Sequence, residues 1–176
     1  MSPATQKARG AYYTDPTVAS FLVRWAVRTS ADRVLEPCFG GGVFLRAAMQ
    51  RVAMLNGNPA VRVTGVELDQ AAHEAIVSRV GNELAPGALI RSDFFELDAD
   101  AIGRFSAVVG NPPFIRYQRF RGSQRALALK RAAAAGVKLT ALTSAWAPFL
   151  VHAATFLDSG GRLAMVAPAE LCHAVY

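Results

Sequence analysis

Cysteine and histidine are scarce in this sequence of 176 residues, and each scarcity argues against a class of site. The two cysteines, Cys38 and Cys172, lie far apart and match no metal-binding spacing, which excludes a disulfide scaffold and a cysteine zinc site. They indicate free thiols in a reducing, cytoplasmic setting. The three histidines also lack ligand spacing, and we interpret them as structural or surface residues: His73, His152 and His173.

Long apolar runs are missing as well. No run reaches the roughly 18 residues that a membrane-spanning helix needs, and residues 1–7 lack the apolar segment of a signal peptide. The sequence contains no Ser-His-Asp, Cys-His or Walker pattern and no internal repeat. These absences argue against a membrane protein, a secreted protein and the common hydrolases.

The composition is that of a globular protein with a basic surface. Hydrophobic residues make up 52% of the chain and charged residues 18%. Its 19 Lys and Arg against 13 Asp and Glu give a net charge of +6, which favours a polyanionic partner. The length suits one domain with a core, and we expect a single domain over residues 1–176.

Strand and helix patterns alternate along the chain. Asp15-Pro16 opens the first helix, as a capping carboxylate followed by proline at the first helical position. Ser159-Gly160-Gly161 is expected to turn the last helix into the last strand. We expect an α/β fold, with a mostly parallel sheet and helices on both faces. The expected strands cover 33–36, 61–67, 88–91, 105–109 and 162–167, and the helices 16–28, 43–55, 69–80, 123–135 and 144–158.

The most informative motif is Asn111-Pro112-Pro113-Phe114, which directly follows an apolar run. Two prolines end a strand because they cannot continue its hydrogen-bond ladder. Asn111 is then held at the carboxyl end of a strand, where open α/β sheets bind ligands. The Asn111 side chain and the Pro112 carbonyl can accept both hydrogens of an exocyclic amine while Phe114 stacks on its ring. The alternative is a plain proline-rich turn.

A glycine-rich turn, Gly40-Gly41-Gly42, joins the first expected strand to the second expected helix. Glycines let the backbone approach a ligand closely, and the helix start presents free N–H groups. Gly40 and Gly42 fit a dinucleotide fingerprint, but Leu45 stands at its third glycine position, which counts against NAD. The pattern favours a smaller ligand such as S-adenosylmethionine, with a tight βα turn as the alternative.

Two acids end neighbouring strands. Glu67 is placed to accept both ribose hydroxyls of an adenosine cofactor, unless it is a solvated acid. Asp93 could accept the amine of the cofactor's adenine, with Phe94 packed on that ring, unless it caps a helix or turn. Asp69 is interpreted as the cap of the following helix.

A basic stretch with interleaved aromatic residues begins two residues after Phe114. Cations beside a base pocket are what contacts to DNA phosphates require, although a charge run is often only a solvated face. Its closeness to Asn111 favours the nucleic-acid interpretation. The stretch contains Arg116, Arg119, Arg121, Arg125, Lys130 and Arg131, with Tyr117 and Phe120 between them.

Five motifs in order resemble the gamma-class amino-group (N6-adenine) DNA methyltransferases of restriction–modification systems. The resemblance covers nearly the whole chain, and Ile115-Arg116-Tyr117-Gln118 is typical of the DNA-modifying branch. It implies the Rossmann-like fold of class I S-adenosylmethionine-dependent methyltransferases. The motifs are Gly10-Ala11-Tyr12-Tyr13-Thr14-Asp15-Pro16, Leu35-Glu36-Pro37-Cys38-Phe39-Gly40-Gly41-Gly42-Val43-Phe44-Leu45, Val66-Glu67-Leu68-Asp69, Ser92-Asp93-Phe94-Phe95 and Asn111-Pro112-Pro113-Phe114.

The resemblance also implies roles for individual residues. S-adenosylmethionine would be the cofactor and N6-methyladenine in DNA the product. Arg116, Arg119, Arg121 and Arg125 would belong to the DNA-contacting loop. The methionine part of the cofactor would lie against Tyr13, Thr14, Glu36, Gly40 and Gly42, its ribose at Glu67, its adenine at Asp93 and Phe94, and the target base at Asn111, Pro112, Pro113 and Phe114.

One departure from the family concerns the C-terminal side. Family members continue with two more strands and a target-recognition domain, so we expect the catalytic domain to be incomplete after Tyr176. Protein-glutamine, RNA-adenine and cytosine-N4 methyltransferases are alternatives, as is a truncated S-adenosylmethionine-binding module without turnover. Residues 1–32 are too short for the helical domain that precedes the glycine loop in the protein-glutamine enzymes.

Overall fold

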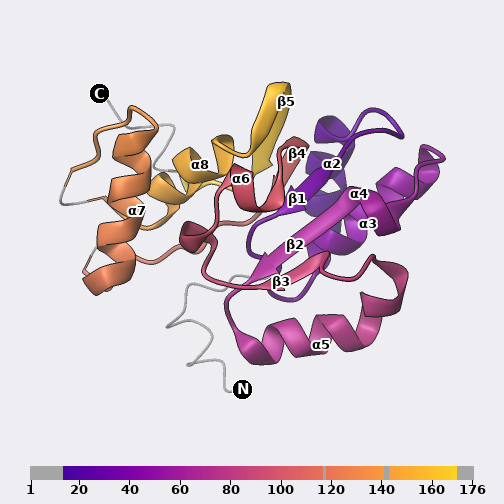
Figure 1. Cartoon of the computed structure of the whole chain (residues 1–176), viewed down its shortest axis with the longest axis horizontal. Helices are drawn as coiled ribbons and strands as arrows, with labels where there is room; N and C mark the ends of the chain where they lie inside the picture. Colours follow the sequence, from indigo (N-terminus) through magenta and orange to yellow (C-terminus); the bar gives the residue numbers. More distant parts are fainter. Residues whose placement is uncertain (1–13, 117, 141–142, 170–176) are drawn as a thin grey trace.

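Five parallel strands form one sheet in the computed structural model, which describes residues 14–116, 118–140 and 143–169. The strand order β3-β2-β1-β4-β5 places the reversal of strand order between β1 and β4 (Figure 1). Open α/β sheets bind ligands beyond the carboxyl ends of the strands at such a point. The strands are β1 (Val34–Glu36), β2 (Val63–Glu67), β3 (Leu89–Arg91), β4 (Phe105–Gly110) and β5 (Leu157–Met165).

Helices connect the strands and cover the sheet. Among the described residues, five helices are longer than two turns: α2 (Pro16–Ala26), α3 (Val43–Met54), α5 (Gln70–Val80), α7 (Gly122–Ala134) and α8 (Trp146–Ala154). Four helices in the same described ranges are short: α4 (Pro59–Arg62), α6 (Ala99–Ile102) and the 3₁₀ helices η1 (Gly81–Glu83) and η2 (Phe94–Glu96). No helix in the described part of the chain has both the length and the apolar character needed to cross a membrane.

Each face of the sheet has its own apolar cluster. Val23 of α2 and Phe44 of α3 pack with Ala107 of β4 on one face. Phe94 of η2 and Phe149 of α8 belong to the cluster on the other face, which also includes Leu35 and Val108. Strands buried on both faces read as continuous apolar runs, and this is why β1 and β4 stand out in the sequence. The predicted α/β fold with helices on both faces is confirmed.

Side-chain caps fix the helix starts that the sequence indicates. Asp15 accepts a hydrogen bond from the Thr17 N–H over 2.7 Å, and Asp69 accepts one from the Ala72 N–H over 3.0 Å. The predicted capping roles of Asp15 and Asp69 are confirmed. Gly136, with φ of +83°, follows the end of α7, in a conformation that favours glycine.

The largest difference from the sequence prediction lies in β5. This strand begins at Leu157 rather than at residue 162, so Ser159-Gly160-Gly161 lies inside it instead of before it. Phe105 pairs with Leu157 but Ala107 with Arg162, which makes this part of the strand an irregularity with extra residues. Glycine serves both turns and bulges, so the local sequence does not distinguish them. The predicted helix 144–158 is correspondingly shorter.

Asn58-Pro59 causes a second difference. The Asn58 side chain accepts from the Ala60 N–H over 3.0 Å and opens α4, so β2 begins at Val63 rather than at residue 61. A proline at the first helical position favours this short helix over a longer strand.

Asp32 ties the end of α2 to β5. Its Oδ2 accepts from the Arg28 N–H and from Arg162 Nη2, both over 2.7 Å, and its Oδ1 accepts from Thr29 Oγ1 over 2.8 Å. Burial alone raises the pKa of this carboxyl, but the hydrogen bonds from Arg28 and Thr29 and the charge of Arg162 outweigh burial and lower it. The charged pair therefore stabilises the fold at neutral pH.

We expect Asp32→Ala to lower the free energy of unfolding by roughly 3 kcal/mol, because it leaves Arg162 without its buried partner. A lowered folded-state pKa means that the stabilisation exists above the ordinary value of 3.8 and is lost as the pH falls through the folded-state pKa. Urea unfolding between pH 3 and 7 measures both effects. The exposed Asp100→Ala is the control, and equal stability of the two variants would contradict the prediction.

Candidate cofactor and base-binding site

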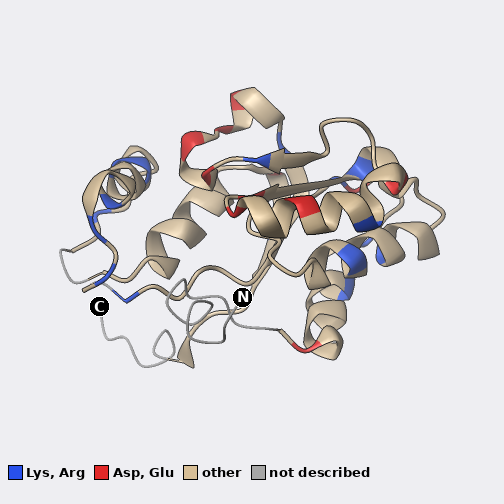
Figure 2. Ribbon diagram, turned by 90° about the horizontal axis from the view of Figure 1, so that it is seen from below, with Lys and Arg blue, Asp and Glu red and all other residues tan. Residues whose placement is uncertain are grey.

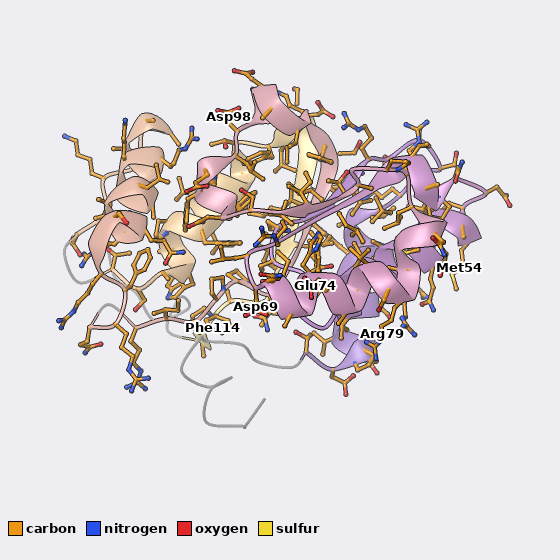
Figure 3. The ribbon with its side chains drawn as sticks, turned by 60° about the horizontal axis from the view of Figure 1, so that its bottom comes forward. Met54, Asp69, Glu74, Arg79, Asp98 and Phe114 are labelled. Atoms are coloured by element: carbon orange, nitrogen blue, oxygen red, sulfur yellow. The ribbon has the colours of Figure 1, made fainter. Side chains whose placement is uncertain are left out.

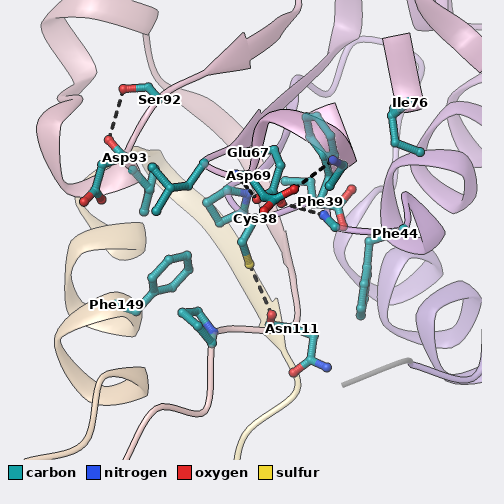
Figure 4. A pocket seen from close by; sticks show the side chains of 18 of the residues that line it. Cys38, Phe39, Phe44, Glu67, Asp69, Ile76, Ser92, Asp93, Asn111 and Phe149 are labelled. Atoms are coloured by element: carbon teal, nitrogen blue, oxygen red, sulfur yellow. Dashed lines mark hydrogen bonds between the residues drawn. The ribbon is translucent and has the colours of Figure 1, made fainter. Parts of the chain in front are cut away.

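A cavity of about 1060 Å³ opens beside the carboxyl ends of β1, β2, β3 and β4 (Figure 4). Loops from four strands meet here because parallel strands end at the same edge of the sheet. Gly42, Pro112 and Phe114 are not among the residues that line it, and Tyr13 lies outside the described residues. The predicted site residues that do line it are Thr14, Glu36, Gly40, Glu67, Asp93, Phe94, Asn111 and Pro113.

Backbone groups hold the carboxylate of Glu67, the last residue of β2. Oε2 accepts from the Gly40 N–H over 2.8 Å, and Oε1 accepts from the Asp69 N–H over 2.8 Å. The turn after β1 and the turn after β2 are thereby joined through one side chain (Figure 4). Each carboxylate oxygen can accept a second hydrogen bond, so the oriented Glu67 carboxylate can still accept hydrogen bonds from a ligand.

Gly40 and Gly42 play different structural roles in the glycine turn. Gly40 and Gly42 have φ of +46° and +75°, in the left-handed region that favours glycine. A Cβ atom on Gly42 would lie 2.7 Å from Cδ1 of Ile76 in α5, whereas one on Gly40 would meet nothing within 4 Å. Gly42 thus serves close packing against α5, and Gly40 leaves open space at the cavity.

Glu36, the last residue of β1, is a buried acid at the wall of the cavity. The residue is 2% exposed, and its Oε2 has no hydrogen-bond partner among the described residues. Burial raises the pKa of this carboxyl well above its usual 4.5. A hydrogen bond from the Leu45 backbone lowers the pKa, and the negative charge of Glu67 raises it further. A buried carboxylate oxygen of this kind fits a ligand that carries a positive group.

Asn111 follows β4 and connects to the segment that precedes α2. Its Nδ2 donates to Thr14 Oγ1 over 3.1 Å, and its backbone carbonyl accepts from Cys38 Sγ over 3.1 Å. Burial, followed by the charges of Glu36 and Glu67, raises the pKa of the Cys38 thiol well above 9.0, so the sulfur keeps its proton as a donor. The structure therefore brings together Thr14 and Asn111, which are 97 positions apart in the chain.

Asp93 lines the cavity and also caps η2. Oδ1 accepts from the Phe95 N–H over 3.0 Å, and Oδ2 accepts from Gln124 Nε2 over 3.0 Å. The interpretation of Asp93 as a cap is confirmed, and the residue also lines the cavity. Phe94 is 4% exposed, with its ring centroid 5.1 Å from that of Phe149 and 4.9 Å from that of Phe156. Its ring belongs mainly to the core.

His152 is buried in the same aromatic cluster as Phe94. Its Nε2 lies 3.1 Å from the Phe94 carbonyl, and burial lowers the pKa of the ring. The interpretation of His152 as a structural residue is confirmed.

Sequence reasoning missed further cavity residues, among them Leu68, Gln124 and Phe149. Leu68 directly follows Glu67 and is 56% exposed. The signal for it in the sequence was an apolar residue just after the end of a strand. Gln124 of α7 and Phe149 of α8 reach the cavity from elements far along the chain, and their positions depend on helix packing that no local pattern reports.

The basic stretch lies at one end of the molecule. Figure 2 shows Lys and Arg along α7 and the loop that leads to it. Phe120 is 3% exposed and anchors the loop in the core, while Arg116, Arg119 and Arg121 are exposed. Arg119 also lines the cavity.

Phe114 is half-buried and precedes the basic loop in the chain. In Figure 3, Phe114 and Asp69 lie towards the lower side of the view, whereas Asp98 lies at the opposite side. The aromatic ring predicted to stack on a base is thus on the side where the loops after the strands gather.

Comparison with known proteins identifies the family. The chain matches the family model described as N-6 DNA Methylase over residues 1–173. It belongs to this family. It is 30% identical to the type II methyltransferase M.PaeR7I of Pseudomonas aeruginosa, over 91% of this chain and 32% of that protein. It is 26% identical to the type II methyltransferase M.XamI of Xanthomonas campestris pv. amaranthicola, over 92% of this chain and 30% of that protein.

Solved structures agree on the fold of this N-6 DNA methylase family member. A type I restriction-modification system methyltransferase subunit from Streptococcus thermophilus superimposes with a TM-score of 0.72 at 23% identity, over 93% of this chain and 36% of that one. The type IIL restriction-modification enzyme MmeI in complex with DNA gives a TM-score of 0.66 at 14% identity, over 94% and 31%. The predicted Rossmann-like class I methyltransferase fold is confirmed.

The N-6 DNA methylase chain spans about a third of the length of the curated relatives it matches. Family membership implies S-adenosylmethionine as the cofactor, and the cavity fits this group. S-adenosylmethionine carries a sulfonium and an ammonium, and the cavity is rich in acids although the chain is basic. Four of the chain's 13 acidic residues line it: Glu36, Glu67, Asp69 and Asp93.

Proposed function

We propose that this chain is the catalytic part of a restriction–modification or phage-defence methyltransferase, which transfers a methyl group from S-adenosylmethionine to the N6 amino group of adenine in DNA. The observation that carries the proposal is the position of Asn111 at the same cavity as Glu36, Glu67 and Asp93. One cavity then holds a site for the target amine and a site for the methyl donor.

The cofactor site is proposed residue by residue. Thr14, Glu36 and the glycine turn at Gly40 hold the methionine part, together with Tyr13, while Gly42 lets the turn pack against α5. The orphaned Glu36 oxygen supports an ammonium at that point. The carboxylate of Glu67 accepts the ribose hydroxyls, and Asp93 and Phe94 hold the adenine. Bound S-adenosylmethionine supplies an electrophilic methyl group on sulfur.

The target adenine is proposed to enter beside Asn111. The Asn111 amide oxygen and the Pro112 carbonyl accept the two N6 hydrogens, which keeps electron density on a nitrogen that is otherwise a poor nucleophile. The hydrogen bond from Asn111 Nδ2 to Thr14 supports this role because it fixes which way the amide points. Pro113 shapes the wall, and Phe114 stacks on the base.

Positioning accounts for most of the catalysis in this scheme. Attack on the methyl group is an in-line displacement, and fixed geometry supplies most of the acceleration. The base leaves the duplex at a cost of a few kcal/mol, which stacking on Phe114 helps to offset. No strongly shifted general base is required.

DNA is proposed to bind along the basic loop. The exposed guanidinium groups of Arg116, Arg119 and Arg121, with Arg125 in the first turns of α7, contact phosphates beside the flipped base. We propose that residues 1–176 form a single catalytic domain and that target recognition is supplied by a further region. The short span relative to the curated relatives supports this. The proposed cellular location is the cytoplasm, where DNA and S-adenosylmethionine meet.

Transfer of a labelled methyl group tests the proposal. The chain, in excess over duplex DNA, is incubated with S-adenosylmethionine labelled on the methyl carbon, and the nucleosides are then separated. We expect the label in N6-methyladenine. Label in N4-methylcytosine, or label in RNA or a protein glutamine but not in DNA, would overturn the assignment of the substrate.

A further inference from the structure

Two side chains on one face of α7 hold the wall of the cofactor pocket. Gln124 and Arg131 are seven residues apart, about two helical turns, and therefore lie on the same face. Nε of Arg131 donates to the Phe95 carbonyl over 3.0 Å, and its Nη1 lies 3.7 Å from Asp98 Oδ2. Gln124 contacts Asp93 at the other end of the same wall. Helix α7 thus contacts the η2 region at two points, Asp93 and Phe95.

Gln124 differs from Arg131 because it reaches the cavity itself. Its Nε2 donates to Asp93 Oδ2 over 3.0 Å, while the Phe95 N–H donates to Oδ1 over 3.0 Å. The two donors together fix the plane of the carboxylate. One further lone pair on each oxygen remains to accept a hydrogen bond from a ligand.

We propose that Gln124 is a positioning residue that orients Asp93 and thereby sets the preference of the pocket for a 6-amino purine over a 6-keto purine in the cofactor. The inference rests on the proposed cofactor site. A carboxylate held by two donors accepts the N–H of an exocyclic amine, whereas it repels the oxygen of a keto group. Without Gln124, the carboxylate can turn about its terminal torsion, and the discrimination weakens.

The amide is suited to this position because it donates without adding charge. A carboxylate hydrogen-bonded to a neutral donor keeps its negative charge and its acceptor strength. A glutamate of the same shape lacks the N–H donor and places a second negative charge beside Asp93. The substitutions Gln124→Ala and Gln124→Glu therefore separate the loss of the donor from the loss of side-chain volume.

The test is calorimetric titration of S-adenosylhomocysteine and S-inosylhomocysteine into the wild-type chain and its variants at pH 8. We expect the wild type to favour the adenosine compound, and Gln124→Ala and Gln124→Glu to reduce the ratio of the two dissociation constants by about tenfold, the effect of one hydrogen bond to a charged group. Arg131→Met should weaken both compounds alike and leave the ratio unchanged, because Arg131 supports only the wall. The exposed Lys130→Ala should change neither affinity.

The outcomes separate this inference from the proposed function. If both Gln124 variants are folded, as their melting temperatures show, and keep the wild-type ratio of the two dissociation constants, the positioning role is overturned. The proposed cofactor site is then unaffected. Failure of the folded wild type to bind either compound overturns the cofactor site and the inference with it. A ratio that falls in both Gln124 variants but not in Arg131→Met supports the inference.

Discussion

Asn111→Ala is expected to reduce the rate of methyl transfer to DNA by about 10²- to 10³-fold, the typical effect of removing a hydrogen-bonding group that acts on the reacting centre. The substitution removes the amide that we propose receives the target amine and also the hydrogen bond to Thr14 Oγ1. Cofactor affinity should change little, because the proposed contacts to the ribose and adenine, at the end of β2 and at the start of η2, are left in place.

The measurement for Asn111 is single-turnover transfer of a labelled methyl group with the chain in excess, combined with calorimetric titration of S-adenosylmethionine. Asn82→Ala, an exposed substitution in η1, is the matched control and should retain the wild-type rate. Full methylation of adenine by Asn111→Ala would show that the target amine is received elsewhere.

Glu36→Gln is expected to weaken the binding of S-adenosylmethionine by about 30- to 100-fold and to abolish proton release on binding. The buried Glu36 carboxyl is neutral in the free protein below its raised pKa, and we expect it to ionise when the cofactor's ammonium binds beside it. The affinity of the wild type should therefore rise with pH until the raised pKa is passed. The magnitude corresponds to loss of a hydrogen-bonded charge pair worth roughly 2–3 kcal/mol.

Rising pH increases the expected affinity for the cofactor, but through the same Glu36 carboxyl it lowers the stability of the cofactor-free chain. In the unfolded chain Glu36 ionises near its usual pKa of 4.5, whereas in the folded chain it holds its proton to higher pH. The unfolded state then binds fewer protons, so stability falls as the pH rises from 4.5 through the raised pKa. Glu36→Gln removes this penalty and should be more stable than the wild type at neutral pH.

Titration in two buffers of different ionisation enthalpy measures the proton release, and thermal unfolding measures the stability. Glu83→Gln is the control, since it makes the same chemical change at an exposed position. Equal proton release by the wild type and Glu36→Gln would show that Glu36 does not face the ammonium.

Most of the fold could be predicted because the signals are local. Buried parallel strands such as β4 read as apolar runs, and Asp15 and Asp69 mark helix starts through hydrogen bonds within three residues. The irregular start of β5 could not be predicted, because Gly160 suits a turn and a bulge equally. Only pairing with β4 decides between them.

The site was predictable to the extent that it is built from strand ends. Glu36, Glu67 and Asn111 each end or follow a strand, and the parallel sheet brings them to one edge. The contact between Gln124 and Asp93 was not predictable, because it spans 31 positions and depends on how α7 docks against η2. The different roles of Gly40 and Gly42 were not predictable either, because they depend on how α5 packs against the glycine turn.

Titration of S-adenosylmethionine into the wild-type chain and into Glu67→Ala tests the central claim most directly. The Gly40 and Asp69 N–H groups hold the Glu67 carboxylate, which we propose accepts the ribose hydroxyls. We predict saturable binding to the wild type and affinity lower by about tenfold or more in the folded variant, the effect of losing hydrogen bonds to a charged acceptor. Equal affinity of the two proteins, or no binding to the folded wild type, would contradict the assignment of this cavity to the cofactor.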